Sequence, residues 1–171
     1  MRAAQSGSVE AFTQLVAKYR PSLFRFLLTR TRSQADAEDA LQDTFLNAFR
    51  YLRSYDAKWR FNTWLYRIAV RSALKARGLD FAELAEVQDP GGDPLAQLEA
   101  ASERANLWAS ARRLLSEEVF TAMWLRYVED MSHREIAETL DRTVSWTKVN
   151  LLRARNALDA ELSRPGGEAH G

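Results

Sequence analysis

The 171-residue chain is 46% hydrophobic and 27% charged, a balance typical of a folded protein with a buried core. It contains no cysteine and two histidines, which excludes a disulfide framework and leaves few ligands for a zinc site. No apolar run approaches the ~20 residues that a membrane-spanning helix needs, and the N-terminus lacks a secretory signal pattern, so we expect a cytoplasmic protein.

Charge is distributed unevenly along the chain, although the formal net charge is only +1. Residues 1–80 carry 14 basic against 7 acidic residues, residues 81–111 carry 1 against 6, and residues 112–171 carry 9 against 10. A basic excess suits a polyanionic partner, whereas an acidic segment suits a linker or a decoy for basic surfaces.

Helical periodicity dominates the sequence. Apolar residues recur at intervals of three and four, and no alternating run is bounded by hairpin signals, so we predict an all-α protein. A first helix is expected over residues 9–19. A second is expected from Pro21, because proline suits the first turn of a helix.

Two further helices are predicted before residue 79. Ser33, with Asp36 three residues on, marks a helix start by the capping-box pattern. The buried side of this third helix is predicted to carry Leu41, Phe45, Ala48, Phe49 and Leu52. The fourth helix is expected to begin near Arg60 and to end at Gly78.

A linker is predicted over residues 79–94, because Pro90, Gly91, Gly92 and Pro94 interrupt every helical period there. The chain is therefore expected to form two small helical domains, residues 1–78 and 95–164, joined by a flexible acidic linker. Residues 165–171 are expected to be a frayed tail.

Four helices are expected in the C-terminal part. The first reaches about residue 115, the second spans about residues 116–129, a short third begins at Ser132, and a longer fourth follows Thr143. Ser132 and Glu135 form a capping-box pair ahead of apolar anchors, which is typical of a helix-turn-helix. A plain helical hairpin is the alternative.

Acidic side chains follow one face of the third predicted helix. Asp36, Asp39 and Asp43 are spaced by three and four residues, so their carboxylates share one exposed stripe, which Glu38 and Gln42 widen. Three interpretations are open: a solvated face favoured by the helix dipole, a metal or acid–base site, and a docking face for a basic partner helix.

Aromatic and basic side chains are interleaved over residues 51–69, YLRSYDAKWRFNTWLYRIA. Tyr55 and Trp59 precede the fourth helix, in a loop where no periodic core explains them. Within the helix, Phe61 is predicted to belong to the core and Trp64 to lie at its edge. The accessible side, which suits a phosphate backbone, is expected to carry Thr63, Arg67 and Arg71.

Several segments, taken in order, resemble the extracytoplasmic-function (group IV) sigma factors of bacterial RNA polymerase, which belong to the sigma-70 family. The core-binding helix of sigma region 2 is similar to DAEDALQDTFLNAFRYL, and its promoter-melting helix is similar to FNTWLYRIAVRSAL. Sigma region 4 is similar to LLSEEVFTAMWLRYVEDMSHREIAETL followed by LLRARNAL. The resemblance runs nearly end to end.

The resemblance implies a non-enzymatic transcription initiation factor with a region 2 domain and a region 4 domain. Its implied partners are core RNA polymerase, through the β′ clamp coiled coil and the β flap, promoter DNA, and an anti-sigma factor. It implies no cofactor, no catalytic residue, no metal and no direct membrane insertion. By the same resemblance, the linker would thread near the polymerase active centre and RNA exit path.

The implied contacts fall on three sets of residues. The core-binding set is Asp36, Glu38, Asp39, Gln42 and Asp43. The minus-ten set, with a pocket for a flipped base in YDAKW, is Tyr55, Asp56, Lys58, Trp59, Arg60, Asn62, Thr63, Trp64, Arg67 and Arg71. The minus-thirty-five set, on a helix entering the major groove, is Thr143, Ser145, Trp146, Lys148, Val149 and Arg153.

The recognition helix departs from the family pattern. Members commonly have glycine and an apolar residue in the turn, where Asp141 and Arg142 stand, and a Thr-Val pair where Trp146 and Thr147 stand. Because Trp146 offers apolar contact to thymine methyl groups but no bidentate hydrogen bonding, we expect an atypical minus-thirty-five preference or a role in binding an inhibitory partner.

Two other functions fit parts of the pattern. A stand-alone helix-turn-helix regulator would bind duplex DNA as a dimer without polymerase, and a helical adaptor would bind neither DNA nor polymerase. An enzyme is not expected, because the sequence has no glycine-rich phosphate loop, no cysteine nucleophile and no cluster of histidines with acids.

Overall fold

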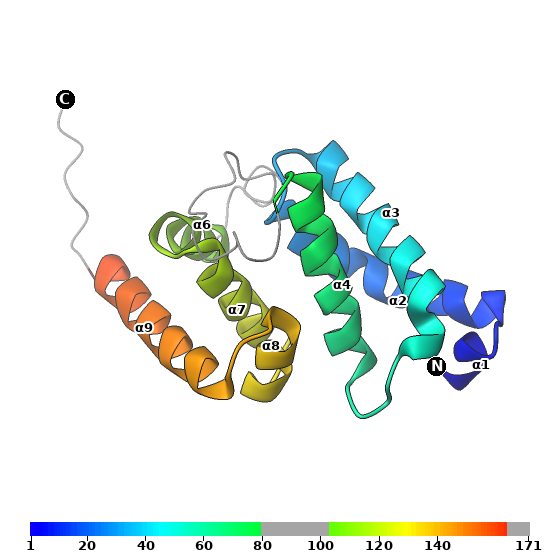
Figure 1. Ribbon diagram of the computed structural model, residues 1–171. Helices are drawn as coiled ribbons and strands as arrows, with labels where there is room; N and C mark the ends of the chain where they lie inside the picture. The colour runs from blue at the N-terminus through cyan, green and yellow to red at the C-terminus, as the bar shows by residue number, and fades with distance from the viewer. Residues whose placement is uncertain (80–102, 164–171) are drawn as a thin grey trace.

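The computed structural model describes residues 1–79 and 103–163, and within that part every regular element is helical. The all-α prediction is confirmed. Figure 1 shows the helices in two groups, with α4 between α3 and α8. The elements are α1 Arg2–Gln5, α2 Val9–Leu28, α3 Gln34–Tyr51, the 3₁₀ turn η1 Leu52–Ser54, α4 Phe61–Ala76, α6 Glu103–Leu114, α7 Glu117–Tyr127, α8 His133–Leu140 and α9 Val144–Leu162.

Helix α2 runs through Pro21 without a break, so the prediction of two separate helices there is wrong. Proline removes one backbone donor and leaves the carbonyl of Ala17 without its helical hydrogen bond. Both residues are exposed, so water can satisfy that carbonyl. The helix also packs along α3, where the Phe12 and Phe49 ring centroids lie 5.0 Å apart.

Helices α3 and α4 begin and end close to their predicted bounds. The Ser33 hydroxyl accepts a hydrogen bond from the Asp36 backbone N–H at the start of α3. Gly78 follows α4 with a φ of 69°, the left-handed conformation that glycine adopts at little cost. On the buried side of α3, Phe49 differs from the prediction: it is 51% exposed, because it lies at the rim beside Phe12.

The four predicted C-terminal helices are all present. Ser116, Ser132 and Thr143 each accept a backbone hydrogen bond at the start of a helix, and Ser132 completes the capping box with Glu135. Asp141 ends α8 with a φ of 55°, in the left-handed region where glycine is favoured and aspartate is tolerated. Helices α8 and α9 therefore form the predicted helix-turn-helix.

The two helical groups pack against each other along a seam. The Phe26 ring of α2 lies 6.5 Å from the Trp124 ring of α7. Nearby, the Glu117 carboxylate of α7 forms ion pairs with Arg30 and Arg77, with N···O distances of 2.5 Å and 3.1 Å. The side chains of both arginines are only 4% exposed. The predicted linker, residues 79–94, lies outside the described residues apart from Leu79, and so do residues 95–102 and 164–171.

Burial at the seam is strong enough to change the titration of an arginine. Burial lowers the pKa of Arg30 to about 10, although the charge of Glu117 acts in the opposite direction. The guanidinium therefore stays protonated at neutral pH, and its charge stabilises the Glu117 carboxylate.

Within the described ranges, 1–79 and 103–163, no helix is long and apolar enough to span a membrane.

Candidate nucleic-acid and polymerase interface

The acidic face of α3 is open to solvent at its centre. Glu38, Asp39 and Gln42 are exposed, whereas Asp36 and Asp43 at the two ends are half-buried. The Asp43 carboxylate lies 3.6 Å from the Nζ atom of Lys75 on α4. Among the residues that the structure describes, no group of three His, Cys, Asp or Glu side chains could hold a metal ion. The geometry suits a docking face for a basic partner.

The loop before α4 is ordered by its own side chains. The Tyr55 hydroxyl donates to the carbonyl oxygen of Trp59 at 2.6 Å, and the Tyr55 ring lies 5.6 Å from Phe61 and 5.5 Å from Trp64. Tyr55 is therefore part of an aromatic cluster, contrary to the expectation that no core explains it. Trp59 is half-buried at the edge of the loop.

The Asp56 side chain holds the loop backbone between Tyr55 and Trp59. The Asp56 carboxylate accepts from the backbone N–H of Lys58 at 3.0 Å, and its second oxygen lies 3.6 Å from the Lys58 Nζ atom. Such a turn presents both charged side chains to solvent, where each is exposed. The loop is thus a preformed surface with one packed ring, Tyr55, and one ring at its rim, Trp59.

Helix α8 covers the loop rim and the first turns of α4. The Arg134 guanidinium lies 5.1 Å from the centroid of the Trp59 ring, a cation–π contact. On the next turns, the Arg67 Nη1 atom lies 2.6 Å from the Glu138 Oε1 atom. Arg67 and Glu138 are 71 residues apart in the sequence, so these contacts join distant parts of the chain.

Glu135 makes the central contact between α8 and α4. Its carboxylate accepts from the Thr63 hydroxyl at 3.0 Å and lies 3.7 Å from the Arg60 Nη1 atom. Thr63 is therefore only 1% exposed, so the prediction that it lies on an accessible side is wrong. We call Trp59, Arg60, Thr63 and Arg67 the α4 strip, and Arg134, Glu135 and Glu138 the α8 triplet.

The surroundings of Glu135 favour its charged form. Burial acts to raise the pKa of this carboxyl, but hydrogen bonds from Ser132 and Thr63 and the charge of Arg60 outweigh it. The pKa therefore lies below its ordinary value of 4.5. At neutral pH, α8 presents an ionised carboxylate to a hydroxyl donor and a guanidinium of the α4 strip.

The other predicted minus-ten residues lie around this contact. Asn62 and Trp64 are half-buried on α4, and Arg71 is exposed farther along the same helix. Although Arg71 is exposed overall, partial burial and the charge of Arg67 lower its pKa, with Asp141 acting in the opposite direction. The structure therefore brings the predicted minus-ten residues together, and it places an acidic helix on part of them.

The N-terminal face of α9 has a different environment. Ser145, Lys148, Val149 and Arg153 are exposed along it, and Thr143 caps the helix by accepting from the Trp146 backbone N–H at 3.0 Å. Helix α9 has 19 residues, about five turns in all, and Leu151 and Leu158 anchor it to the core.

Trp146 itself is half-buried beside the turn of the helix-turn-helix. The Arg142 guanidinium lies 5.5 Å from its ring centroid and holds Glu118 of α7 through bonds of 2.5 and 3.2 Å. Arg142 therefore connects the turn of the helix-turn-helix to α7 within the same helical group. The sequence pattern could not show this, because Glu118 stands among charges at a helix start, where acids complement the helix dipole.

Sequence reasoning also missed the contacts across the seam. Glu117 pairs with Arg30 at a separation of 87 residues. The sequence pattern assigned Glu135 a role only in a capping box, and it assigned Glu138 none. No periodicity links side chains so far apart. The one available signal was the charge pattern, since the basic N-terminal part needs acids elsewhere in the chain.

Two family models match the chain: Sigma-70 region 2 over residues 15–78 and Sigma-70, region 4 over residues 110–158. The ECF RNA polymerase sigma-E factor of Haemophilus influenzae is 33% identical over 92% of this chain and 90% of that protein. Both matched regions contain the residue sets described above.

Solved structures show the same arrangement of helices. CnrH, in complex with the cytosolic domain of CnrY, matches with a TM-score of 0.71 and 26% identity over 96% of each chain. The sigma factor RpoE, in complex with the anti-sigma factor NepR from Bartonella quintana, matches with a TM-score of 0.68 and 21% identity over 92% of this chain and all of that one. With both regions matched in order and in fold, the chain belongs to the sigma-70 family, as an RNA polymerase sigma factor of the extracytoplasmic-function group.

Proposed function

We propose that this sigma factor binds core polymerase through the acidic face of α3, holds the melted minus-ten strand on α4 and its preceding loop, and places the N-terminal half of α9 in the minus-thirty-five major groove. The proposed core-binding residues are the five of the acidic face, and the β flap is the proposed site for the region 4 domain. Catalysis belongs to the polymerase.

The exposed centre of the acidic face carries this proposal. Glu38, Asp39 and Gln42 project from a helix whose opposite side is buried, so the face is rigid and accessible. Oppositely charged surfaces raise association rates and fix the orientation of a complex. A stand-alone regulator of duplex DNA has no use for such a face.

Stacking and phosphate contacts supply the proposed melting energy. An aromatic side chain that stacks on a base is worth roughly 1 to 3 kcal/mol, and unpairing a base costs a few kcal/mol, so a few rings and cations offset the cost. Trp59 is the ring at the rim of the loop, and Arg67 and Arg71 lie beyond it on α4. Tyr55 supports the loop from below through its contacts with Phe61 and Trp64.

An anti-sigma factor is the proposed regulator of this chain. One structural relative is a complex with an anti-sigma factor, and the other is a complex with the cytosolic domain of a second protein. We place the protein in the cytoplasm, where the polymerase acts, and assign it no enzymatic activity.

Charge reversal on the acidic face tests the proposal. Glu38→Lys with Asp39→Lys is expected to weaken binding to purified core polymerase by about tenfold or more, corresponding to 1.4 kcal/mol or more. Fluorescence anisotropy of the labelled chain measures the affinity, and run-off transcription measures the outcome. Glu10→Lys with Asp159→Lys makes the same charge change on exposed positions elsewhere and should leave core binding unchanged. Equal affinities for the two double variants would contradict the proposal.

A further inference from the structure

Helix α1 contacts the turn that leads into the loop before α4. It packs against α2 and against η1, and its Ala4 is only 3% exposed. From the end of α1, the Gln5 side-chain amide donates to the Tyr55 carbonyl oxygen at 3.0 Å and to the Leu52 carbonyl oxygen at 3.4 Å. These acceptors lie 50 and 47 residues from Gln5 in the sequence. The contact therefore joins α1 to a distant part of the chain.

The two carbonyl groups mark the place where the helical path of α3 and η1 ends. Leu52 is the first residue of η1, and Tyr55 is its C-cap, with an extended backbone at φ −64° and ψ 123°. Carbonyl groups at a helix end lack donors from the next turn, so side chains or water must supply them. One amide nitrogen carries two N–H donors and can serve both oxygens. Gln5 thus holds the backbone where it enters the loop.

Tyr55 connects this point to the far end of the loop. Its carbonyl accepts from Gln5, and its hydroxyl donates to the Trp59 carbonyl oxygen at 2.6 Å. Its ring packs at 5.6 Å from Phe61 and 5.5 Å from Trp64, measured between ring centroids. A shift of the Tyr55 backbone would therefore be passed on to Trp59, the ring at the rim of the loop.

The position of α1 does not depend on the loop alone. Gly7 has a φ of 100°, a conformation that residues with a side chain rarely adopt, and it reverses the chain between α1 and α2. The reversal is closed by the backbone N–H groups of Gly7 and Ser8, which donate to Ala4 and Ala3 at 3.0 Å each. Gln5 is therefore presented to the loop by an element that is fastened to α2.

We propose that Gln5 is a positioning residue for promoter melting: its amide holds Tyr55, and Tyr55 holds Trp59 where a base of the melted strand stacks. The proposal rests on the proposed minus-ten function of the loop. It gives α1 a part in melting although Gln5 acts through Tyr55 and not on the strand. Loss of the amide should thus affect melting and leave binding to core unchanged.

A series of variants at position 5 separates hydrogen bonding from packing. Gln5→Met keeps a side chain of similar length and volume but removes both donors. Gln5→Glu keeps the shape and places a carboxylate, which only accepts when ionised, against two carbonyl oxygens. The matched control is Ser6→Ala, which removes the hydrogen bond from the Ser6 hydroxyl to the Arg2 carbonyl, 2.9 Å long, beside the same helix.

A spin label reports the loop in the free chain without any DNA. The chain has no cysteine, and Ala57 is exposed in the loop, so Ala57→Cys gives a unique labelling position. The electron paramagnetic resonance spectrum should narrow in Gln5→Met and Gln5→Glu, because the loop moves more freely, and stay unchanged in Ser6→Ala. An unaltered spectrum in both position-5 variants would overturn the proposal. Equal narrowing in Ser6→Ala would also overturn it, since the cause would then be a general loosening of α1.

The rate of melting is the functional readout. With core polymerase, Gln5→Met is expected to form open complexes about threefold or more slowly, as for the loss of one or two hydrogen bonds. Affinity for core and promoter occupancy before melting should stay the same. Permanganate reactivity followed over time measures the rate, and Ser6→Ala should match the unaltered chain. A normal rate in Gln5→Met would contradict the proposal. Failure of the minus-ten function would appear separately, as normal open complexes formed by Trp59→Ala.

Discussion

The two surfaces proposed to read DNA are presented in opposite ways. The N-terminal face of α9 exposes Ser145, Lys148, Val149 and Arg153 to solvent. The α4 strip instead lies under α8, with Thr63 buried and Arg67 paired to Glu138. The surface proposed for duplex DNA is open, and the surface proposed for the melted strand is closed.

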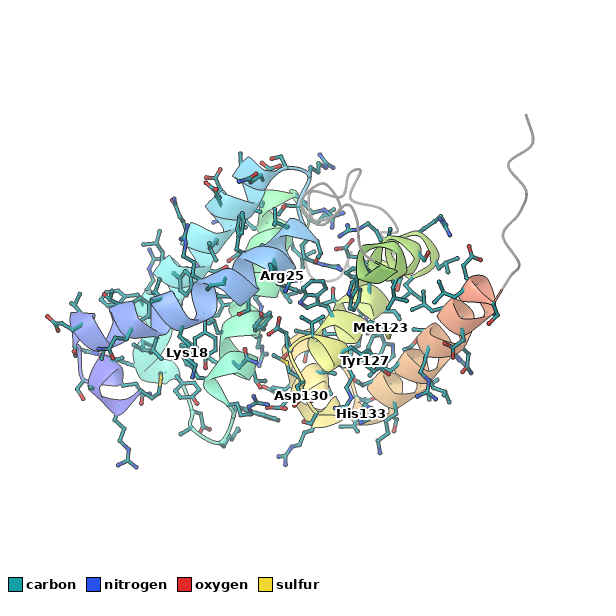
Figure 2. All side chains as sticks on the ribbon, turned by 180° about the vertical axis from the view of Figure 1, so that it is seen from behind. Lys18, Arg25, Met123, Tyr127, Asp130 and His133 are labelled. Atoms are coloured by element: carbon teal, nitrogen blue, oxygen red, sulfur yellow. The ribbon has the colours of Figure 1, made fainter. Side chains whose placement is uncertain are left out.

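The two surfaces therefore start from different states, one exposed to solvent and the other packed against α8. A basic, aromatic surface binds any single strand by stacking and charge, with little sequence preference. The closed arrangement places acids of the same chain on that surface. Figure 2 shows the seam from behind, with Lys18 and Arg25 on the α2 side and Tyr127, Asp130 and His133 on the α7–α8 side.

The largest expected effect is a loss of folding stability when the buried end of the seam is altered. Glu117→Gln leaves two buried guanidinium groups, Arg30 and Arg77, without their carboxylate. Breaking a buried ion pair on one side typically costs about 3–5 kcal/mol, so we expect a loss of that size in the free energy of unfolding. Urea titration followed by circular dichroism measures it. A loss below about 1 kcal/mol, the value of an exposed pair, would contradict the seam described here.

A smaller effect is expected at the rim of the strip. Trp59→Ala should reduce open-complex formation with core by about tenfold, because a lost stacking contact is worth roughly 1 to 3 kcal/mol. Affinity for core should stay the same, since Trp59 lies off the acidic face of α3. Permanganate footprinting measures the melted bases. If footprints match those of the unaltered chain at equal core occupancy, Trp59 does not hold the strand.

A further prediction concerns the open surface. Trp146→Ala should weaken binding to a minus-thirty-five duplex or to the inhibitory partner by a few-fold, as expected for one apolar contact worth about 1 kcal/mol. Trp146 also packs partly against the core, so thermal unfolding must be followed in parallel. Unchanged affinity for both ligands would remove Trp146 from the recognition surface.

The smallest expected effect is a change in how the contact between α8 and α4 depends on pH. The pKa of Glu135 is lowered in the folded chain, so its stabilising contribution is complete above about pH 4.5 and is lost as pH falls below that value. Burial raises the pKa of Glu129 near the seam, which gives a contribution of opposite sign. Energy transfer between a label at Ala17→Cys on α2 and one at Ala160→Cys on α9, both exposed positions, should therefore fall less steeply below about pH 4.5 in Glu135→Gln than in the unaltered chain. Parallel pH profiles would show that Glu135 does not hold α8.

The sequence predicted local features well and long-range contacts poorly. Ser116, Ser132 and Thr143 predicted helix starts correctly, because capping involves neighbours within three residues. Pro21 misled the prediction, because packing on α3 kept α2 continuous. Thr63 misled it for a related reason: helical spacing gives the face of α4, but only tertiary structure shows that α8 covers it.

The candidate site was likewise predictable only in part. The acidic face of α3 is a property of one helix, so spacing alone placed Asp36, Asp39 and Asp43 together. The contact between α8 and the α4 strip depends on Glu135 and Glu138, which lie more than seventy residues from their partners in the first region. A pattern within one helix carries no information about such a partner.

The proposed use of α4 by the melted strand is best tested by energy transfer between labels at Ala17→Cys and Ala160→Cys while core polymerase is added. We expect high transfer in the free chain and a clear fall as core binds, together with a gain in single-strand binding by the complex. Transfer that stays high in complexes that melt promoter DNA would contradict it, because α8 would then still cover the strip during melting.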